Sequence, residues 1–134
     1  MRSSILVIDD DAEDIEIIQD AFNSLQYPNV TYCTNAFEAI DRLAAAAPGC
    51  LPNLIVTDNC MPASEGFEFI RHLKEAAEYA AIKVVVLSTH VSEGNKEKLL
   101  HAGVLKVITK PQSFPQYLSV SLGLTQIAEQ PLTK

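Results

Sequence analysis

The chain has 134 residues, of which 48% are apolar and 20% are charged, and this composition predicts one globular domain with a hydrophobic core. The formal net charge of −7, without a long basic run, argues against nucleic acid or an anionic membrane surface as a direct partner. Three cysteines (Cys33, Cys50 and Cys60) without CxxC spacing argue against a disulfide framework and a zinc site, and the absence of a secretory signal or membrane span predicts a cytoplasmic protein.

Short apolar runs rich in β-branched residues recur along the chain and predict strands. In chain order they are ILVI (5–8), NVTYC (29–33), LIV (54–56), IKVVVL (82–87) and VLKVIT (104–109). A continuous run such as ILVI is typical of a strand that is covered on both faces, as in a parallel sheet. We therefore expect parallel strands rather than half-exposed antiparallel ones.

Between these runs, apolar residues recur at three- and four-residue spacing, which predicts helices. The periodic sets are Ile15, Ile18, Phe22 and Leu25; Ala36, Ile40 and Leu43; Phe67, Ile70, Leu73 and Ala77; Leu99 and Leu100; and Tyr117, Val120, Leu124 and Ile127. A strand followed by a helix, repeated five times, predicts an α/β fold with a doubly wound parallel sheet and helices on both faces. We expect residues 1–134 to form this single domain.

Polar residues follow the predicted strands at the points where the strands end. They are Asp9, Asp10 and Asp11 after the first run, Asp58 after the third, Ser88 and Thr89 after the fourth and Lys110 after the fifth. Because ligands of a doubly wound sheet bind beyond the carboxyl ends of its strands, we expect these residues to form one cluster. Gathered carboxylates attract a hard cation such as Mg²⁺, and a carboxylate can attack phosphorus. An ammonium and a hydroxyl group would then neutralise the phosphoryl oxygens.

The motifs VIDDD, VTDNCMP with Gly66 following, VVVLST and VITKP, in this order on the predicted elements, resemble the receiver domain of two-component response regulators. The resemblance covers residues 5 to about 127 and implies a flavodoxin-like fold of five strands and five helices. It implies that Asp58 accepts a phosphoryl group from a histidine kinase or a histidine phosphotransfer protein. The chain would then be a signalling domain rather than an enzyme.

The resemblance also implies a magnesium site. Asp9 and Asp10 would hold Mg²⁺ directly or through water, together with Asp58 and the backbone carbonyl of Cys60. No other cofactor is implied.

The remaining site residues would contact the phosphoryl group. Ser88 would donate a hydrogen bond to a phosphoryl oxygen, with Thr89 as the alternative, and Lys110 would pair with Asp58 or its phosphate. The family's cis peptide would correspond here to the Lys110–Pro111 bond, since X–Pro is the only kind of peptide bond where the cis form costs little.

Three positions depart from the family pattern or modify it. Val107 stands where the family commonly has an aromatic residue in the fifth strand, so the usual coupling of hydroxyl group to ring is in question. Cys60 and His90 occupy the positions that tune the lifetime of the phosphorylated state. Cys60 is small and leaves room for water, and His90 either contacts the phosphoryl group or is an exposed loop residue.

Other polar residues have simpler interpretations. Asp11, Glu13 and Asp14 are not required by the motif and should open the following helix, whose dipole favours acids there. His72 and His101 lie in helical patterns without a Cys or His at ligand spacing, so we expect them at the surface or at a helix end.

Two alternative functions remain open from the sequence. An aspartate-nucleophile phosphatase also uses Asp and Mg²⁺, and Asp9 and Asp11 have the spacing of such enzymes, but the chain is short for the cap that they need. A degenerate receiver would only bind a partner; Val107 favours this, and the intact set of Asp58, Ser88 and Lys110 argues against it.

Partner binding is expected on one face. We expect the phosphorylated form to bind an unidentified downstream protein through residues 92–127, and the chain to be a monomer or a phosphorylation-linked dimer.

Overall fold

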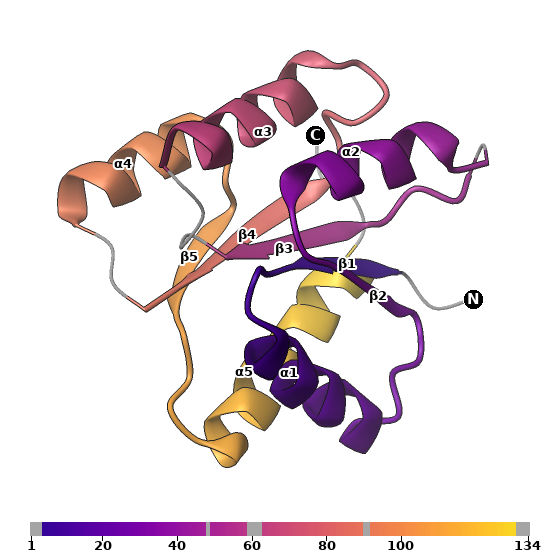
Figure 1. Cartoon of the computed structure of the whole chain (residues 1–134), viewed down its shortest axis with the longest axis vertical. Helices are drawn as coiled ribbons and strands as arrows, with labels where there is room; N and C mark the ends of the chain where they lie inside the picture. The colour runs from indigo at the N-terminus through magenta and orange to yellow at the C-terminus, as the bar shows by residue number, and fades with distance from the viewer. Residues whose placement is uncertain (1–3, 48, 59–62, 90–91, 131–134) are drawn as a thin grey trace.

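The computed structural model describes residues 4–47, 49–58, 63–89 and 92–130, with the backbone alone for residues 63–67. Strands and helices alternate along the chain, as the periodicity predicts (Figure 1). The strands are β1 (Ile5–Ile8), β2 (Val30–Cys33), β3 (Leu54–Asp58), β4 (Lys83–Ser88) and β5 (Lys106–Thr109), and the helices are α1 (Ala12–Ser24), α2 (Ala36–Ala45), α3 (Ala63–Glu75), α4 (Glu93–His101) and α5 (Phe114–Glu129). The five strands form one parallel sheet in the order β2-β1-β3-β4-β5, which confirms the predicted fold class.

The central strands are covered on both faces. Every residue of β1 and β3 is buried, whereas the edge strands β2 and β5 are partly exposed. This is the reason that the runs of the central strands are continuously apolar while the run of β2 contains an exposed polar residue, Thr31. The weak strand signal at NVTYC therefore marks a sheet edge.

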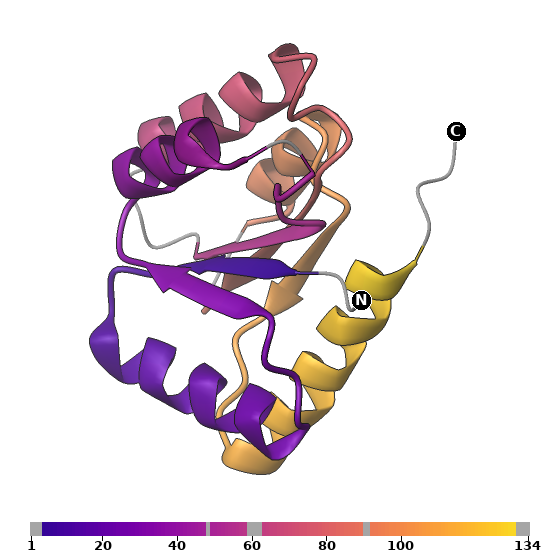
Figure 2. The ribbon, with the colours of Figure 1, turned by 90° about the vertical axis from the view of Figure 1, so that its right-hand side faces the viewer.

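The helices lie in two layers. Helices α2, α3 and α4 cover one face of the sheet, and α1 and α5 cover the other (Figure 2). The alternation of side chains along β1 serves both layers: Leu6 and Ile8 join the core beneath α2 to α4, while Ile5 and Val7 join the core beneath α1 and α5. One sheet thus separates two hydrophobic cores, each of which fixes the helices above it.

The layer of α1 and α5 is also tied by polar contacts at the amino-terminal edge of the sheet. The Tyr27 hydroxyl, just after α1, donates to Oε2 of Glu129 at the end of α5, at 2.9 Å. The Lys83 ammonium at the start of β4 donates to the carbonyl oxygen of Ile127 at 2.7 Å. The Lys83 bond satisfies a backbone carbonyl in the last turn of α5, where the helix runs out of its own donors.

The start of α1 confirms the prediction for the acids after β1. Oδ1 of Asp11 accepts a hydrogen bond from the backbone N–H of Glu13 at 2.9 Å, so Asp11 is the N-cap, and Glu13 and Asp14 lie in the first turn. Helix α3 ends at Glu75, so Ala77, which the periodicity places in that helix, lies beyond it. Within the described ranges, no helix has the length and apolar content to cross a bilayer.

Candidate functional site

The candidate site lies where β1 and β3 end side by side. Parallel pairing places Ile8 opposite Thr57, so the next residues, Asp9 and Asp58, are neighbours at the carboxyl edge of the sheet. Both side chains are buried, with 7% of Asp9 and 3% of Asp58 exposed. After β1 the chain continues to β2 on one side, and after β3 it continues to β4 on the other side, so the strand order reverses between β1 and β3. Ligands of doubly wound sheets bind at such a point.

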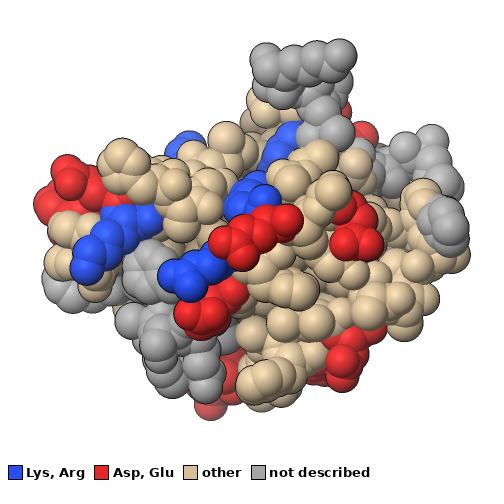
Figure 3. Space-filling model, turned by 90° about the horizontal axis from the view of Figure 1, so that it is seen from above, with Lys and Arg blue, Asp and Glu red and all other residues tan. Residues whose placement is uncertain are grey.

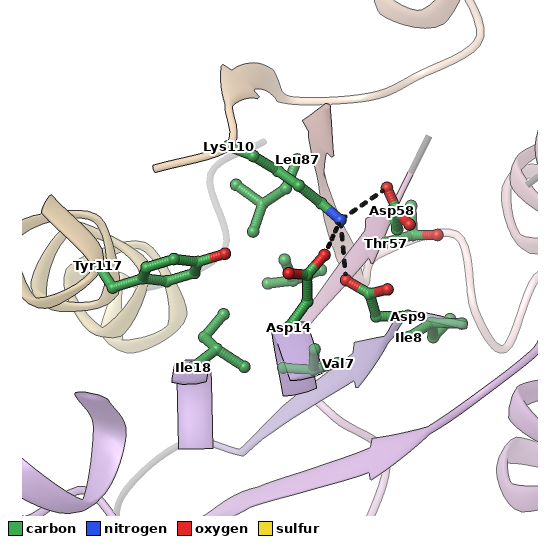
Figure 4. A pocket seen from close by; sticks show the side chains of 11 residues that line it. Val7, Ile8, Asp9, Asp14, Ile18, Thr57, Asp58, Leu87, Lys110 and Tyr117 are labelled. Atoms are coloured by element: carbon green, nitrogen blue, oxygen red, sulfur yellow. Dashed lines mark hydrogen bonds and ion pairs between the residues drawn. The ribbon is translucent and has the colours of Figure 1, made fainter. Parts of the chain in front are cut away.

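Lys110 enters this site from the residue after β5 and meets three carboxylates (Figure 4). Its Nζ lies 2.6 Å from Oδ2 of Asp14, 3.1 Å from Oδ2 of Asp9 and 3.3 Å from Oδ1 of Asp58. The predicted meeting of Asp9, Asp58 and Lys110 is therefore present in the fold. Because the ammonium and two of its partners are buried, these are ion pairs in a medium that screens them little.

Three carboxylates are placed so that they could share a cation. One oxygen each of Asp9, Asp10 and Asp58 lies within 4.8 Å of the others. Asp9 and Asp58 are buried and Asp10 is exposed, so the group opens to solvent on one side. Carboxylate oxygens with a path for water suit Mg²⁺, which keeps several waters when bound to protein. The site has more carboxylates than the single ammonium of Lys110 can neutralise, and a divalent cation fits this excess of negative charge.

Burial and neighbouring charges shift the pKa values of Asp9 and Lys110. Burial raises the pKa of Asp9 from 3.8 to about 6, assisted by the charge of Asp58 and opposed by the hydrogen bond from the Asp11 backbone and by Lys110. For Lys110, burial alone would lower the pKa, but the hydrogen bond to Asp14 and the charges of Asp9 and Asp58 outweigh it and raise the pKa. Lys110 is therefore held as an ammonium.

The end of β4 brings a hydroxyl group to the same edge. Ser88 is the last residue of β4 and is buried, while Thr89 directly after it is exposed. Asp58 pairs with Leu87, so Ser88 lies one residue further along the neighbouring strand. The Lys110 backbone N–H donates to the Ser88 carbonyl at 2.8 Å, which joins the ends of β4 and β5.

The structure corrects the expectation for the Lys110–Pro111 peptide bond and does not test those for Cys60 and His90. The Lys110–Pro111 peptide was expected to be cis, but no cis bond occurs among the described residues, and the bond is trans. Trans is also the form that an X–Pro bond intrinsically prefers. Cys60 and His90 lie outside the described residues, so the contributions predicted for the Cys60 carbonyl and the His90 side chain stay predictions.

The other singled-out residues lie away from the site or at its margin. Val107 lies in β5 and packs, half-buried, against the core beneath α2 to α4. The ring of His72 in α3 lies beside that of Tyr79, with centroids 6.0 Å apart, and His101 is exposed in the last turn of α4. The two histidines thus have the positions expected of surface or helix-end residues.

Sequence reasoning missed Asp14 as a member of the site. It was assigned only to the helix start, yet it makes the shortest of the three contacts to Lys110. One signal was available: Asp14 lies four residues before Ile18, which is buried, so the two share the inward face of α1.

The sequence pattern also predicts the burial of Tyr117 but not its position beside the site. Its periodicity in α5 predicts a core residue, and 6% of it is exposed, but its hydroxyl points toward Asp14 and Lys110 (Figure 4). Burial and the charge of Asp14 raise the pKa of Tyr117. With Asp9, Asp14 and Lys110 it lines a cavity of about 10 Å³, the size of a single water molecule.

A sheet with the order 2-1-3-4-5 is the flavodoxin-like type of doubly wound fold. Acids after β1, an acid at the end of β3 and a lysine after β5 place the chain among the members of that class with an acidic site at the switch point. The profile of the response regulator receiver domain matches residues 5–120, so the chain belongs to this family of two-component signalling domains. Receiver domains are signalling proteins rather than classical enzymes.

Individual relatives agree with this assignment. The chain is 30% identical over 110 residues to the uncharacterized 14.6 kDa protein in the sodA1 3'region of Leptolyngbya boryana, covering 82% of this chain and 80% of that one. It is 25% identical over 118 residues to the polar-differentiation response regulator DivK of Brucella anthropi, covering 88% and 92%. Among solved structures, the phosphorylated cyanobacterial phytochrome response regulator RcpA is similar, with a TM-score of 0.82, 27% identity and coverage of 96% and 94%.

Proposed function

We propose that Asp58 accepts a phosphoryl group from a histidine kinase or a histidine phosphotransfer protein in a magnesium-dependent reaction, and that this switches binding to a downstream protein. The observation that carries the proposal is the position of Asp58. Its carboxylate is buried at the end of β3, in the same group as Asp9 and Asp10 and 3.3 Å from Lys110. A nucleophilic carboxylate beside both acids and an ammonium matches the needs of phosphoryl transfer.

The transfer itself requires no further reactant. A carboxylate oxygen of Asp58 forms a bond to phosphorus while the bond between phosphorus and the donor's imidazole nitrogen breaks. The imidazole leaves with the bonding electron pair and regains a proton from solvent. Lys110, held as an ammonium, neutralises charge on the phosphoryl oxygens, and Ser88 at the end of β4 donates a hydrogen bond to one of them.

The residues that would hold Mg²⁺ are Asp9, Asp10 and Asp58, with the carbonyl of Cys60 as a predicted fourth ligand. When bound, the ion supplies positive charge to the carboxylates and to the incoming phosphoryl oxygens. The oxygen-only donor set and the exposed side of Asp10 support Mg²⁺ over a softer metal.

The partner face that we propose comprises α4, β5 and α5. Four large apolar side chains there are at least 41% exposed: Leu100, Leu105, Phe114 and Leu122. Exposed apolar residues on these elements support a protein partner or a second copy of the chain. Figure 3 looks onto the layer of α2, α3 and α4, of which only α4 belongs to the proposed face, and on that layer basic and acidic side chains are interspersed rather than uniformly basic as nucleic acid would favour.

The organisation of the chain is also a proposal. All described strands belong to one sheet, which supports a single receiver domain over residues 1–134. The cytoplasmic location stays a prediction.

The decisive experiment uses acetyl phosphate and Mg²⁺, followed by intact mass measurement before and after alkali. We expect one alkali-labile phosphoryl adduct that is lost in Asp58→Asn and retained in the control Asp20→Asn, which removes an exposed acid of α1. An adduct that persists in Asp58→Asn would move the site elsewhere. Absence of any adduct in the natural chain would support the degenerate receiver.

The same samples test the phosphatase alternative. Asp11, which the phosphatase spacing would require, is instead the N-cap of α1 and is exposed. We expect no sustained hydrolysis of small phosphate esters. Turnover that survives Asp58→Asn would overturn the receiver function.

A further inference from the structure

The contact between Asp14 and Lys110 has a consequence for the switch, resting on the function proposed for Asp58. We propose that Asp14 is a positioning residue: it holds the Lys110 ammonium toward α1 in the unphosphorylated protein and releases it when Asp58 carries a phosphoryl group. The resting state would then be stabilised by Asp14, a residue that is not among those predicted to bind metal or phosphate.

The distances show which carboxylates the Lys110 ammonium contacts. Its Nζ donates hydrogen bonds to Oδ2 of Asp14 at 2.6 Å and to Oδ2 of Asp9 at 3.1 Å, while Asp58 lies at 3.3 Å. An ammonium has three hydrogens, so a phosphoryl group on Asp58 must compete with these acceptors. It brings greater negative charge and more oxygens than a carboxylate, and it therefore draws the ammonium toward β3.

The burial of the three carboxylates determines which of them Lys110 can leave at the lowest cost. The side chain of Asp14 is 27% exposed, whereas those of Asp9 and Asp58 are 9% and 1% exposed. If Lys110 left Asp9, a buried carboxylate would lose an ion pair with little access to water, which is costly. If it leaves Asp14, water replaces the ammonium at a partly exposed carboxylate. Asp14 is therefore the partner that can be released at the lowest cost.

The release of Asp14 would be transmitted to α1 and α5. Asp14 and Ile18 lie on the inward face of α1, and Ile18 packs in the same core as Tyr117 of α5. Figure 4 shows the Tyr117 ring beside both Asp14 and Lys110. Val107, at the position of the family's usual aromatic residue, packs in the opposite core. The aromatic ring that lines the pocket around Lys110 thus comes from α5.

A titration with beryllium fluoride, a mimic of the phosphoryl group, in the presence of Mg²⁺ tests this proposal. We expect Asp14→Asn to bind the mimic about threefold to tenfold more tightly than the natural chain, because the competing anion is lost. The control is Glu13→Gln, an exposed acid in the same turn with the same change of charge, which should stay within about twofold. Asp14→Glu, which restores the charge, should return the affinity toward the natural value.

Hydrogen exchange separates a positioning role from a general effect of charge. We expect saturating beryllium fluoride to increase exchange at the backbone amides of residues 15–18 in the natural chain and in Glu13→Gln. In Asp14→Asn these amides should already exchange at the higher rate and change little. Equal affinities and equal exchange responses in Asp14→Asn and Glu13→Gln would overturn the proposal while leaving the function of Asp58 intact. Failure of the natural chain to bind the mimic would overturn both.

Discussion

The Lys110 backbone N–H donates to the carbonyl oxygen of Ser88 at 2.8 Å, so the two residues proposed to contact the phosphoryl group are joined through their backbones. The bond holds the start of the β5–α5 connection against the end of β4. It leaves the Lys110 side chain to cross the edge of the sheet toward Asp9 and Asp58. The ammonium therefore has a fixed base and a flexible stem, which suits a charge that must change partners.

Replacing Lys110 by Met should destabilise the protein when Mg²⁺ is absent. The substitution keeps most of the stem but leaves the buried Asp9 and Asp58 carboxylates without their ammonium. We expect the free energy of unfolding at pH 7 to fall by about 3–5 kcal/mol in urea titrations. The control Lys106→Met, at an exposed position of β5, should change it little. Equal stabilities of the two variants would contradict a structural contribution of the buried ion pairs.

Magnesium should raise the melting temperature of the natural chain near neutral pH. The ion would bind the folded carboxylate group of Asp9, Asp10 and Asp58 and not the unfolded chain, so stability grows with its concentration. A concentration one hundred times the dissociation constant corresponds to about 2.7 kcal/mol. Asp10→Asn should reduce the rise measured by calorimetry, and Asp20→Asn should retain it. An unchanged melting temperature in the natural chain would mean that the carboxylates do not form the proposed metal site.

Replacing Gly103 or Gly123 by alanine should change the free energy of unfolding in opposite directions. Gly103 has a φ of +111°, and a Cβ added there would lie 2.9 Å from Cγ of Lys74. We expect Gly103→Ala to lower the free energy of unfolding by about 1 kcal/mol or more, because both the left-handed backbone and the contact oppose it. Gly123 lies within α5, and a Cβ added there would enter open space, so Gly123→Ala should raise the free energy of unfolding by about 0.5–1 kcal/mol. Urea unfolding of both variants checks the signs, and a stabilised Gly103→Ala would contradict the turn geometry.

Cysteine labelling should distinguish Cys33 from Cys50. Burial raises the pKa of Cys33 to about 11, so its thiol stays protonated in the folded protein at pH 8, whereas Cys50 is exposed. In a Cys60→Ser background, a thiol reagent should modify Cys50 rapidly and Cys33 only as fast as the protein unfolds, because the thiolate is the reactive form. Urea should remove the difference. Two equally fast reactions in the folded protein would show that Cys33 is accessible.

Much of the site could be predicted because it depends on strand ends. Ile8 and Asp9 mark the change from a buried strand to a polar edge, and Asp58 does so for β3. In a parallel sheet such ends share one edge, so no knowledge of side-chain packing was needed. Asp14 could not be placed in this way, since an acid in the first turn of a helix already has a local explanation. Its partner Lys110 lies 96 residues away, and only the rotation of α1 on the sheet brings the two together.

The trans form of the Lys110–Pro111 peptide bond could not be predicted from the sequence either. Proline lowers the cost of a cis bond without requiring it, so the residue type leaves the choice to the surrounding loop. Likewise, the periodicity of Tyr117 predicts burial, but the side chain's nearness to Lys110 depends on where α5 crosses the sheet.

The contacts of Tyr27 with Glu129 and of Lys110 with Asp14 lie at opposite ends of the α1–α5 pair. Only the second belongs to the site, so on our proposal a phosphoryl group on Asp58 would weaken one end of the pair while the other end keeps its contact. Phosphorylation would then lower the local stability of α1 and α5 near Asp14 and leave it unchanged near Tyr27. A partner could then recognise two different surfaces on these helices: one end that changes on phosphorylation and one end that does not.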